Sequence, residues 1–253
     1  KDSMFLDGLE DAYEPGRAMG SFAEETCTEY QFTREAQDEY ALRSLSRANE
    51  AIASGAFDRE IVPVEVVGRK GTETITVDEQ PGKANPDKIP TLKPAFAKDG
   101  TITAANASSI SDGAAALVVT RQSVAEAQGL NIAARIVSWA THSQEPAKFT
   151  SAPVPAIRSA MEKAGWTVAD VDLFEVNEAF AMVPMIAMKE LGIPAEKLNV
   201  NGGGTALGHP IGASGARIIA TLIAALQNRG LKRGVASLCI GGGEGTAIAV
   251  EIA

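Results

Sequence analysis

The sequence contains few cysteines, few positive charges and no long apolar run. Two cysteines in 253 residues cannot form a disulfide framework, so we expect a reducing compartment: the cytoplasm, with the mitochondrial matrix as the alternative. No apolar run is long enough to span a bilayer, and the first residues have no signal-peptide pattern. The formal net charge of −9 argues against general nucleic-acid binding, although a local basic patch for an anionic substrate remains compatible with it.

The order of apolar segments indicates an α/β protein. With 45% hydrophobic residues the chain can bury a large core. Strand-like and helical patterns alternate in the second half, which predicts a mostly parallel sheet covered on both faces. The predicted strands are 114–119, 133–140, 171–176, 235–239 and 246–251, with helices at 155–164, 179–191 and 214–229.

Two further elements are predicted upstream. Residues 33–53 place apolar side chains at helical spacing, with Thr33 as N-cap, which predicts an amphipathic helix. Residues 61–77 alternate around a turn at 68–71, which predicts a hairpin. The basic pair Arg69 and Lys70 at this turn fits either a solvated turn or an arm between subunits.

A glycine-rich loop surrounds one of the two histidines. Four glycines lie between Asn199 and His209, and Pro210 follows directly. Glycine lets backbone approach backbone or ligand closely, and proline restricts the residue before it. A glycine loop before a helix can also bind phosphate, but this spacing does not match the dinucleotide or P-loop fingerprints. We interpret the loop as one that orients His209, which by itself is equally compatible with a structural role.

Two other stretches repeat this strand-then-loop pattern. Asn177 follows the strand 171–176, and Cys239 precedes three glycines near the C-terminus. In α/β sheets, ligands bind at the carboxyl ends of strands. We therefore expect the amide of Asn177, the imidazole of His209 and the thiol of Cys239 to meet around one ligand. His142, among polar neighbours, is expected to face solvent instead.

Three motifs together resemble a known family. Asn177-Glu-Ala-Phe180, Gly208-His-Pro-Ile-Gly-Ala-Ser-Gly-Ala-Arg217 and Cys239-Ile-Gly-Gly-Gly243 resemble, in order and spacing, the C-terminal portion of a thiolase of the acetyl-CoA acetyltransferase kind. The similarity extends over the whole chain. It implies a thiolase-like mixed sheet covered by helices on both faces, with an α+β loop domain.

The resemblance also implies a division of the chain. Residues 1–110 would form a loop (lid) domain, 111–131 a returning segment of the N-terminal thiolase domain, and 132–253 the C-terminal thiolase domain.

The implied reaction is reversible Claisen condensation of two acetyl-CoA to acetoacetyl-CoA and CoA, or thiolysis of a 3-ketoacyl-CoA, without a cofactor or metal. By resemblance, His209 donates from Nε2 to the thioester oxygen and helps deprotonate the nucleophile. Asn177 positions a water in the oxyanion hole, Cys239 is the acid/base, and Gly241 offers its N–H to a second oxyanion hole. A thiol's reference pKa of about 8.5 lies near neutral pH and can be tuned lower.

Four residues would contact the substrate. By resemblance, Ala104 and Ser108 lie along the pantetheine arm of CoA, and Met19 and Phe149 lie at the acyl pocket, where an aromatic ring favours short chains. Taken without the family, residues 104–109 are a plain Ser/Asn loop and Met19 is a gap-filler. The family commonly has a histidine at the position of Ala18.

The acylated cysteine of the family is not matched, because neither Cys27 nor Cys239 stands in its motif. The chain also begins with Lys1 rather than Met. We expect the N-terminal half to be missing or supplied as another chain, and this chain alone to be inactive. The other expected partners are acetyl-CoA or acetoacetyl-CoA and a second copy in a homodimer or homotetramer; neither nucleic acid nor a membrane is expected.

Two alternatives remain open. One is a CoA- or lipid-binding module that has lost catalysis, although such a binder does not need an acid/base at Cys239. The other is a decarboxylating condensing enzyme, whose usual pair of histidines is not seen.

Overall fold

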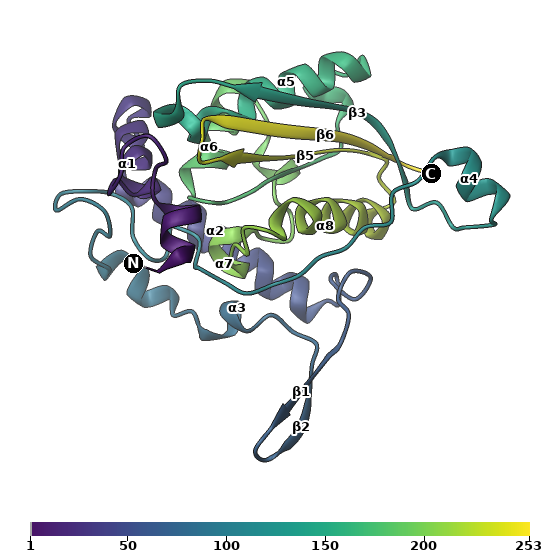
Figure 1. Ribbon diagram of the computed structural model, residues 1–253, viewed down its shortest axis with the longest axis horizontal. Helices are drawn as coiled ribbons and strands as arrows, with labels where there is room; N and C mark the ends of the chain where they lie inside the picture. Colours follow the sequence, from purple (N-terminus) through teal and green to yellow (C-terminus); the bar gives the residue numbers. More distant parts are fainter. Residues whose placement is uncertain (1) are drawn as a thin grey trace.

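A four-stranded sheet forms the centre of the molecule, in the order β3-β6-β5-β4 (Figure 1). The computed structural model describes residues 2–253. β3 (Ala134–Ser143) and β5 (Arg233–Ile240) pair antiparallel with β6 (Glu244–Ile252), whereas β4 (Leu173–Val176) pairs parallel with β5. The expectation of a mostly parallel sheet was wrong. Only three residues, 241–243, connect β5 to β6, and so short a connection joins antiparallel strands.

Helices cover both faces of this sheet. Successive side chains of a strand point to opposite faces, so Phe174 lies in one apolar cluster and Leu173 in another. The first cluster includes side chains of α5 (Pro153–Ala164) and α6 (Met182–Leu191), and the second those of α8 (Ser214–Arg229). Figure 1 shows α5 and α8 on either side of the strands. The predicted mixed sheet with two covered faces is confirmed.

Two further helices, α1 (Met19–Tyr30) and α2 (Arg34–Ala53), pack beside the sheet and the helices that cover it. α2 begins where the sequence predicted, because the Thr33 hydroxyl accepts from the Ala36 N–H at 3.2 Å. α1 was not predicted, and it buries a face that includes Phe22. The remaining helical segments are a π-helix (Phe5–Leu9), α3 (Glu79–Lys83), α4 (Gln122–Ala127), α7 (Gly204–Leu207) and 3₁₀ turns at Pro86–Thr91, Pro146–Ser151, Val168–Asp170 and Ala195–Lys197.

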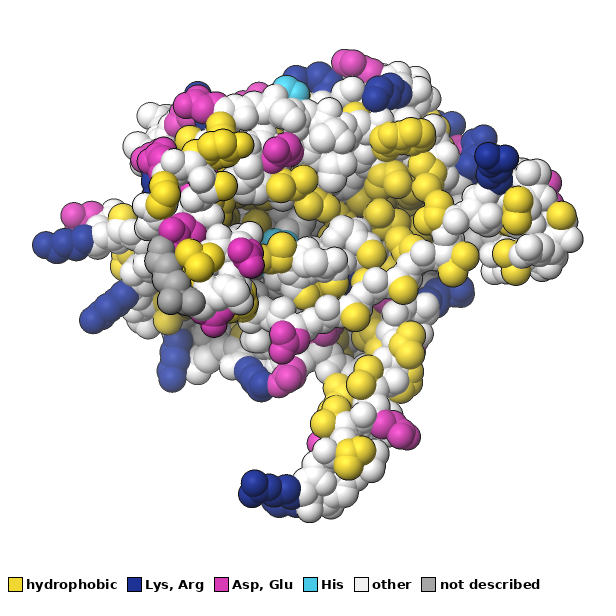
Figure 2. All heavy atoms as spheres, viewed as in Figure 1, with side chains coloured by type: hydrophobic (Ala, Val, Ile, Leu, Met, Phe, Trp, Pro, Cys, Tyr) yellow, Lys and Arg dark blue, Asp and Glu magenta, His cyan; other side chains and the backbone are white. Residues whose placement is uncertain are grey.

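The predicted hairpin exists and projects from the body as an arm (Figure 1). Its strands β1 (Val64–Gly68) and β2 (Gly71–Ile75) pair antiparallel, and every residue in them is exposed. Figure 2 shows apolar side chains along the arm and basic ones at its tip. The arm therefore has no core of its own.

The predicted buried strand 114–119 is not formed. This segment has no regular secondary structure, and Val118 is 93% exposed. A strand needs a neighbour for its backbone N–H and C=O groups, and no other strand within residues 2–253 pairs with it. Across the same range, no helix combines the length and apolar character that crossing a membrane requires.

Candidate functional site

The site begins at the carboxyl ends of the parallel strands β4 and β5. The backbone N–H of Asn177 donates to the carbonyl of Ser237 at 2.9 Å, which continues the β4–β5 ladder by one residue. Cys239 lies two residues further along β5. Because parallel strands end at the same edge of a sheet, Asn177 and Cys239 share that edge.

The glycine loop brings His209 to this edge. Gly208 has φ +96°, and a Cβ at this position would clash with the side chain of Ser111. The backbone N–H of His209 donates to the carbonyl of Ser109 at 3.2 Å. Glycine is therefore required at 208 both for its backbone conformation and for the close approach of segment 109–111.

The imidazole of His209 is held from both sides. Its Nε2 lies 3.4 Å from Nδ2 of Asn177, and its Nδ1 lies 2.6 Å from Oγ of Ser214. Ser214 in turn donates to the carbonyl of Pro210 at 3.0 Å. With its hydrogen on that carbonyl, Ser214 Oγ accepts from Nδ1–H, and Nε2 of the neutral ring accepts from the Asn177 amide. In this tautomer Nε2 can take a proton and becomes a donor once it has done so.

The surroundings keep this ring neutral. Burial, together with the positive charge of Arg217, lowers the pKa of His209 to about 4. An uncharged ring at neutral pH is the form that the tautomer assigned above requires.

Folding stability should therefore depend on His209 in acid. The folded-state pKa of about 4 lies below the ordinary 6.5, so between these values the unfolded chain binds more protons and stability falls as pH falls. Between about pH 7 and about pH 4.5 we expect the unfolding free energy of the wild type to drop by about 2 kcal/mol more than that of His209→Gln. Urea unfolding of both proteins at both pH values measures this difference.

All other titrating groups are present in both proteins. His209→Gln is therefore the reference for their contribution, and the difference between the two losses of stability belongs to His209. Equal losses of stability in the two proteins would show that His209 is not held neutral.

The thiol of Cys239 lies in an apolar cluster with Met19 and Phe149, and all three side chains are buried. Burial raises the pKa of Cys239 to about 12. A thiol pKa can be tuned lower, but here it is raised, because apolar neighbours disfavour a thiolate. As the structure stands, Cys239 carries its proton at neutral pH.

Met19 also contacts the turn that follows Cys239. A Cβ on Gly241 would lie 2.9 Å from the sulfur of Met19, so the absence of a side chain at 241 lets Met19 pack there. Phe149 lies in the 3₁₀ turn that contacts α1, whose first residue is Met19. The structure thus gathers Met19, Phe149, Cys239 and Gly241 in one place, while their contacts with a substrate stay predictions.

The segment predicted to contact pantetheine, residues 104–108, lies beside the turn that follows Asn177. The N–H and hydroxyl of Ser108 both donate to the carbonyl of Ala179, at 3.0 and 2.9 Å, and Ala107 forms a bridge with Phe180. Ala104 is exposed. The segment therefore runs beside the turn after Asn177 and, through Ser109, beside His209.

Sequence reasoning missed two side chains that hold this geometry. Ser214, the partner of His209 Nδ1, was noted only as the start of a helix. Glu178 was quoted in a motif without a role, yet its carboxylate is fully buried and accepts five hydrogen bonds. His142, expected to face solvent, is half-buried and lies 3.2 Å from Oε1 of Gln144. Within residues 2–253, no group of three or more His, Cys, Asp and Glu is arranged to hold a metal.

Comparison with known proteins gives matches along the whole chain. The family description "Thiolase, N-terminal domain" matches residues 1–123, and "Thiolase, C-terminal domain" matches 130–252. The chain is 49% identical to a cytosolic acetyl-CoA acetyltransferase of Mus musculus and 52% identical to an acetyl-CoA acetyltransferase of Escherichia coli K12, covering 99% of this chain and 64% of each relative.

Solved structures give the same result. An acetyl-CoA acetyltransferase of Bacillus anthracis superposes with a TM-score of 0.93 at 46% identity, over 97% of this chain and 62% of the other. A thiolase of Ascaris suum in complex with coenzyme A superposes with a TM-score of 0.90 at 40% identity, over 100% of this chain and 64% of the other. The chain therefore spans just under two thirds of the length of these relatives.

One expectation is corrected by these matches. The N-terminal half was expected to be absent or supplied by another chain, but the N-terminal domain of the family matches residues 1–123. A missing N-terminal half therefore no longer supports the prediction that this chain alone is inactive.

Proposed function

We propose, because this chain belongs to the thiolase family, that it acts as an acetyl-CoA C-acetyltransferase. It would condense two acetyl-CoA to acetoacetyl-CoA and CoA, or cleave a 3-ketoacyl-CoA with CoA. The observation that carries this proposal is the 3.4 Å contact between Asn177 and His209 at the edge where Cys239 lies. Formation of a carbon–carbon bond next to a thioester needs such a group of donors beside an acid/base.

The donors would act on the thioester oxygen. Oδ1 of Asn177 is buried without a hydrogen-bond partner among the described residues, so it can accept from a water that in turn donates to the oxygen. His209, once protonated on Nε2, would donate to the same oxygen. Gly241 would offer its N–H to the oxygen of the tetrahedral intermediate. Preorganised donors of this kind each contribute about a hundred- to a thousand-fold in rate.

Cys239 would transfer the proton at C2 of acetyl-CoA. In cleavage, the CoA sulfur would bond to the 3-keto carbon as its bond to C2 breaks, His209 Nε2 would take the proton of the CoA thiol, and the Cys239 thiol would give its proton to C2 of the departing acetyl-CoA. In condensation, the Cys239 thiolate would take a proton from the acetyl methyl group, and the resulting enolate would bond to the carbonyl carbon of the second acetyl group as CoA leaves it. Because the pKa of this thiol is about 12, only a small fraction of it is thiolate at neutral pH. That thiolate is a strong base.

Two finer proposals concern the substrate and the arm. Phe149 and Met19 are buried in the same apolar cluster as Cys239 and would line the site of a short acyl group, and Ser108 and Ala104 would contact pantetheine. Apolar side chains along the exposed arm fit contact with a second copy in a homodimer or homotetramer. A cytoplasmic location is proposed because the mouse relative is described as cytosolic.

Exchange of the acetyl methyl protons in D₂O tests the proposal directly. It requires only the residues that remove and return a proton, and proton NMR of acetyl-CoA follows it. We expect loss of the methyl signal with the wild type, and consumption of acetoacetyl-CoA when CoA is added. A protein that binds CoA in calorimetry but exchanges no methyl protons would instead be the binding module that lost catalysis.

A further inference from the structure

Two buried hydrogen-bond networks share helix α2, and they reach different parts of the site. We infer that Glu178 is a positioning residue for the Asn177–His209 pair, and that Asp38 separately positions the segment that carries Ser108. This assignment rests on the proposed function for its kinetic consequences. Its structural part, the orientation of His209, can be measured without any activity.

Glu178 is fully buried and is stabilised by hydrogen bonds alone. Its Oε1 accepts from the Tyr40 hydroxyl and the Asn199 amide, both at 2.9 Å. Its Oε2 accepts from the Ser44 hydroxyl at 2.7 Å, and from the N–H and hydroxyl of Thr205 at 3.1 and 2.7 Å. Within residues 2–253, no cationic nitrogen lies within ion-pair distance of this carboxylate.

These five donors come from three separate segments. Tyr40 and Ser44 are one turn apart on α2, Asn199 begins the glycine loop, and Thr205 lies in α7. Tyr40 is a permanent donor, because burial and the charge of Glu178 raise its pKa well above the usual value. Each donor lost would leave a buried carboxylate less well compensated, which the surroundings can relieve only by moving.

The position of Glu178 in the chain links it to both members of the pair. Asn177 precedes it directly, and α7 ends at Leu207, two residues before His209. A Cβ on Gly203 would clash with the Glu178 carboxylate, and one on Gly204 would lie 2.9 Å from its carbonyl. Glu178 therefore spans the gap between the end of β4 and the loop, and so determines how close Asn177 and His209 approach.

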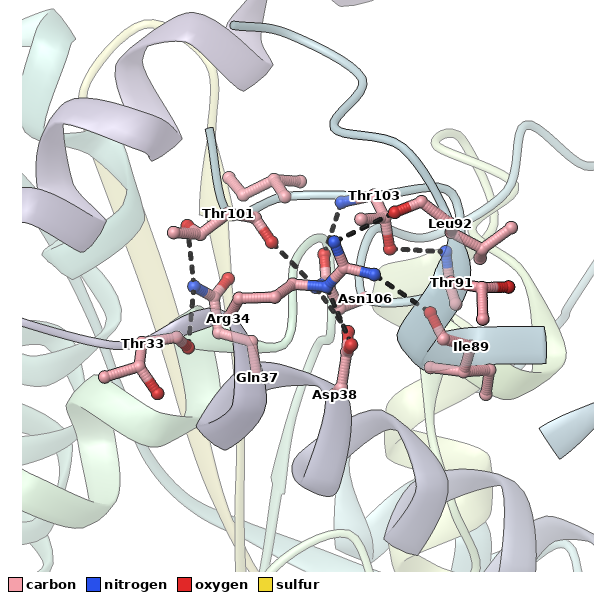
Figure 3. Close-up of polar contacts among 12 residues, drawn as sticks. Thr33, Arg34, Gln37, Asp38, Ile89, Thr91, Leu92, Thr101, Thr103 and Asn106 are labelled. Carbon is pink, nitrogen blue, oxygen red and sulfur yellow. Dashed lines mark hydrogen bonds and ion pairs between the residues drawn. The ribbon is translucent and has the colours of Figure 1, made fainter. Parts of the chain in front are cut away.

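The second network is shown in Figure 3. Asp38 accepts from Nε of Arg34 at 2.7 Å and from the amide of Asn106 at 2.9 Å. Asn106 is fully buried, and its Oδ1 accepts from the Thr103 N–H at 2.7 Å. Arg34 also donates to the carbonyls of Ile89 and Leu92, at 2.9 and 3.0 Å. This network holds residues 101–107, directly before Ser108, against α2.

The two carboxylates are therefore matched controls for each other. Both are buried, and both networks include α2. The Glu178 network holds the residues that flank Asn177 and the loop of His209, whereas the Asp38 network holds the substrate segment, which reaches His209 through one backbone hydrogen bond, to the carbonyl of Ser109. Displacing reacting groups by about 1 Å can cost about a hundredfold in rate, whereas loosening a substrate contact raises KM.

NMR of the histidine rings is the first measurement. The chain has two histidines, and His142→Gln assigns the remaining ring. In Glu178→Gln we expect the ring signals of His209 to shift, because the loop that carries the ring is displaced. In Asp38→Asn the His209 signals should stay within the wild-type range.

Kinetics of methyl-proton exchange are the second measurement. For Glu178→Gln we expect kcat to fall about 10- to 100-fold with KM within about threefold. For Asp38→Asn we expect KM to rise about tenfold with kcat within about threefold. Because Glu178→Gln could fail to fold, Tyr40→Phe and Thr205→Val each remove one hydroxyl donor, and each should lower kcat by a few-fold.

The outcomes separate the two proposals. If the wild type exchanges no protons but His209 responds to Glu178→Gln alone, the positioning role stands and the proposed function falls. If the wild type is active and the two carboxylate variants change the same kinetic parameter, or the His209 signals ignore Glu178→Gln, the positioning role is overturned.

Discussion

Replacing Cys239 with alanine should lower the rate of methyl-proton exchange in acetyl-CoA by about a thousandfold, because the variant has no acid/base at C2. Burial raises the pKa of this thiol to about 12, and the thiolate fraction rises about tenfold per pH unit below the pKa. The wild-type rate should therefore rise about tenfold between about pH 7 and about pH 8, and the variant should lose this dependence. Proton NMR in D₂O over this range measures both.

The second cysteine is the control for this experiment. Cys27 is also buried, and burial raises its pKa to about 12 as well, but it lies in α1, and its sulfur donates to Oε1 of Gln37 in α2. Cys27→Ala should keep both the rate and its rise with pH. A Cys239→Ala protein whose rate still climbs with pH would show that another group removes the proton.

Gly202→Ala should destabilise the protein by about 4 kcal/mol. Gly202 has φ +78°, which a residue with a side chain adopts at a cost of about 1 kcal/mol. The added Cβ would also lie 2.6 Å from the carbonyl oxygen of Ser44 and 2.8 Å from Cβ of Ala48, both in α2, whose backbone cannot turn aside. The glycine loop would have to separate from α2, and urea unfolding measures the loss.

Gly230→Ala isolates the backbone part of this effect. Gly230 has φ +64° at the end of α8, and no atom lies within 4 Å of an added Cβ. Its replacement should cost only about 1 kcal/mol. Similar losses in the two variants would mean that the contact between the loop and α2 contributes nothing to stability.

Elements whose local pattern agrees with their surroundings could be predicted from the sequence. The Thr33 cap and the apolar spacing located α2, and a glycine turn located the arm. The pairing direction of the strands could not be found by the alternation of helix and strand, because it depends on which strands become neighbours. The strand predicted at 114–119 does not form for a similar reason. Its apolar residues are typical of a buried strand, but no strand within residues 2–253 pairs with it. The domain limits at 110 and 131 stay predictions.

The site could be located from sequence, but its electrostatics could not. The motifs placed Asn177, His209 and Cys239 at loop starts, and the structure joins the first two at the edge that carries the third. Burial raises the pKa of Cys239, and this burial involves residues remote in sequence, such as Met19 and Phe149 of the same apolar cluster. Glu178 escaped notice because its donors lie far from it in sequence: Tyr40 and Ser44 are more than a hundred residues upstream, and Asn199 and Thr205 are more than twenty residues downstream.

The arm has a consequence for how the protein behaves in solution. Both of its strands expose their outer N–H and C=O groups together with valine and isoleucine side chains, and an isolated two-stranded ribbon is marginally stable in water. Such an edge is a template for pairing with any compatible strand. The feature that suits ordered assembly thus makes a crowded or partly unfolded sample prone to aggregation.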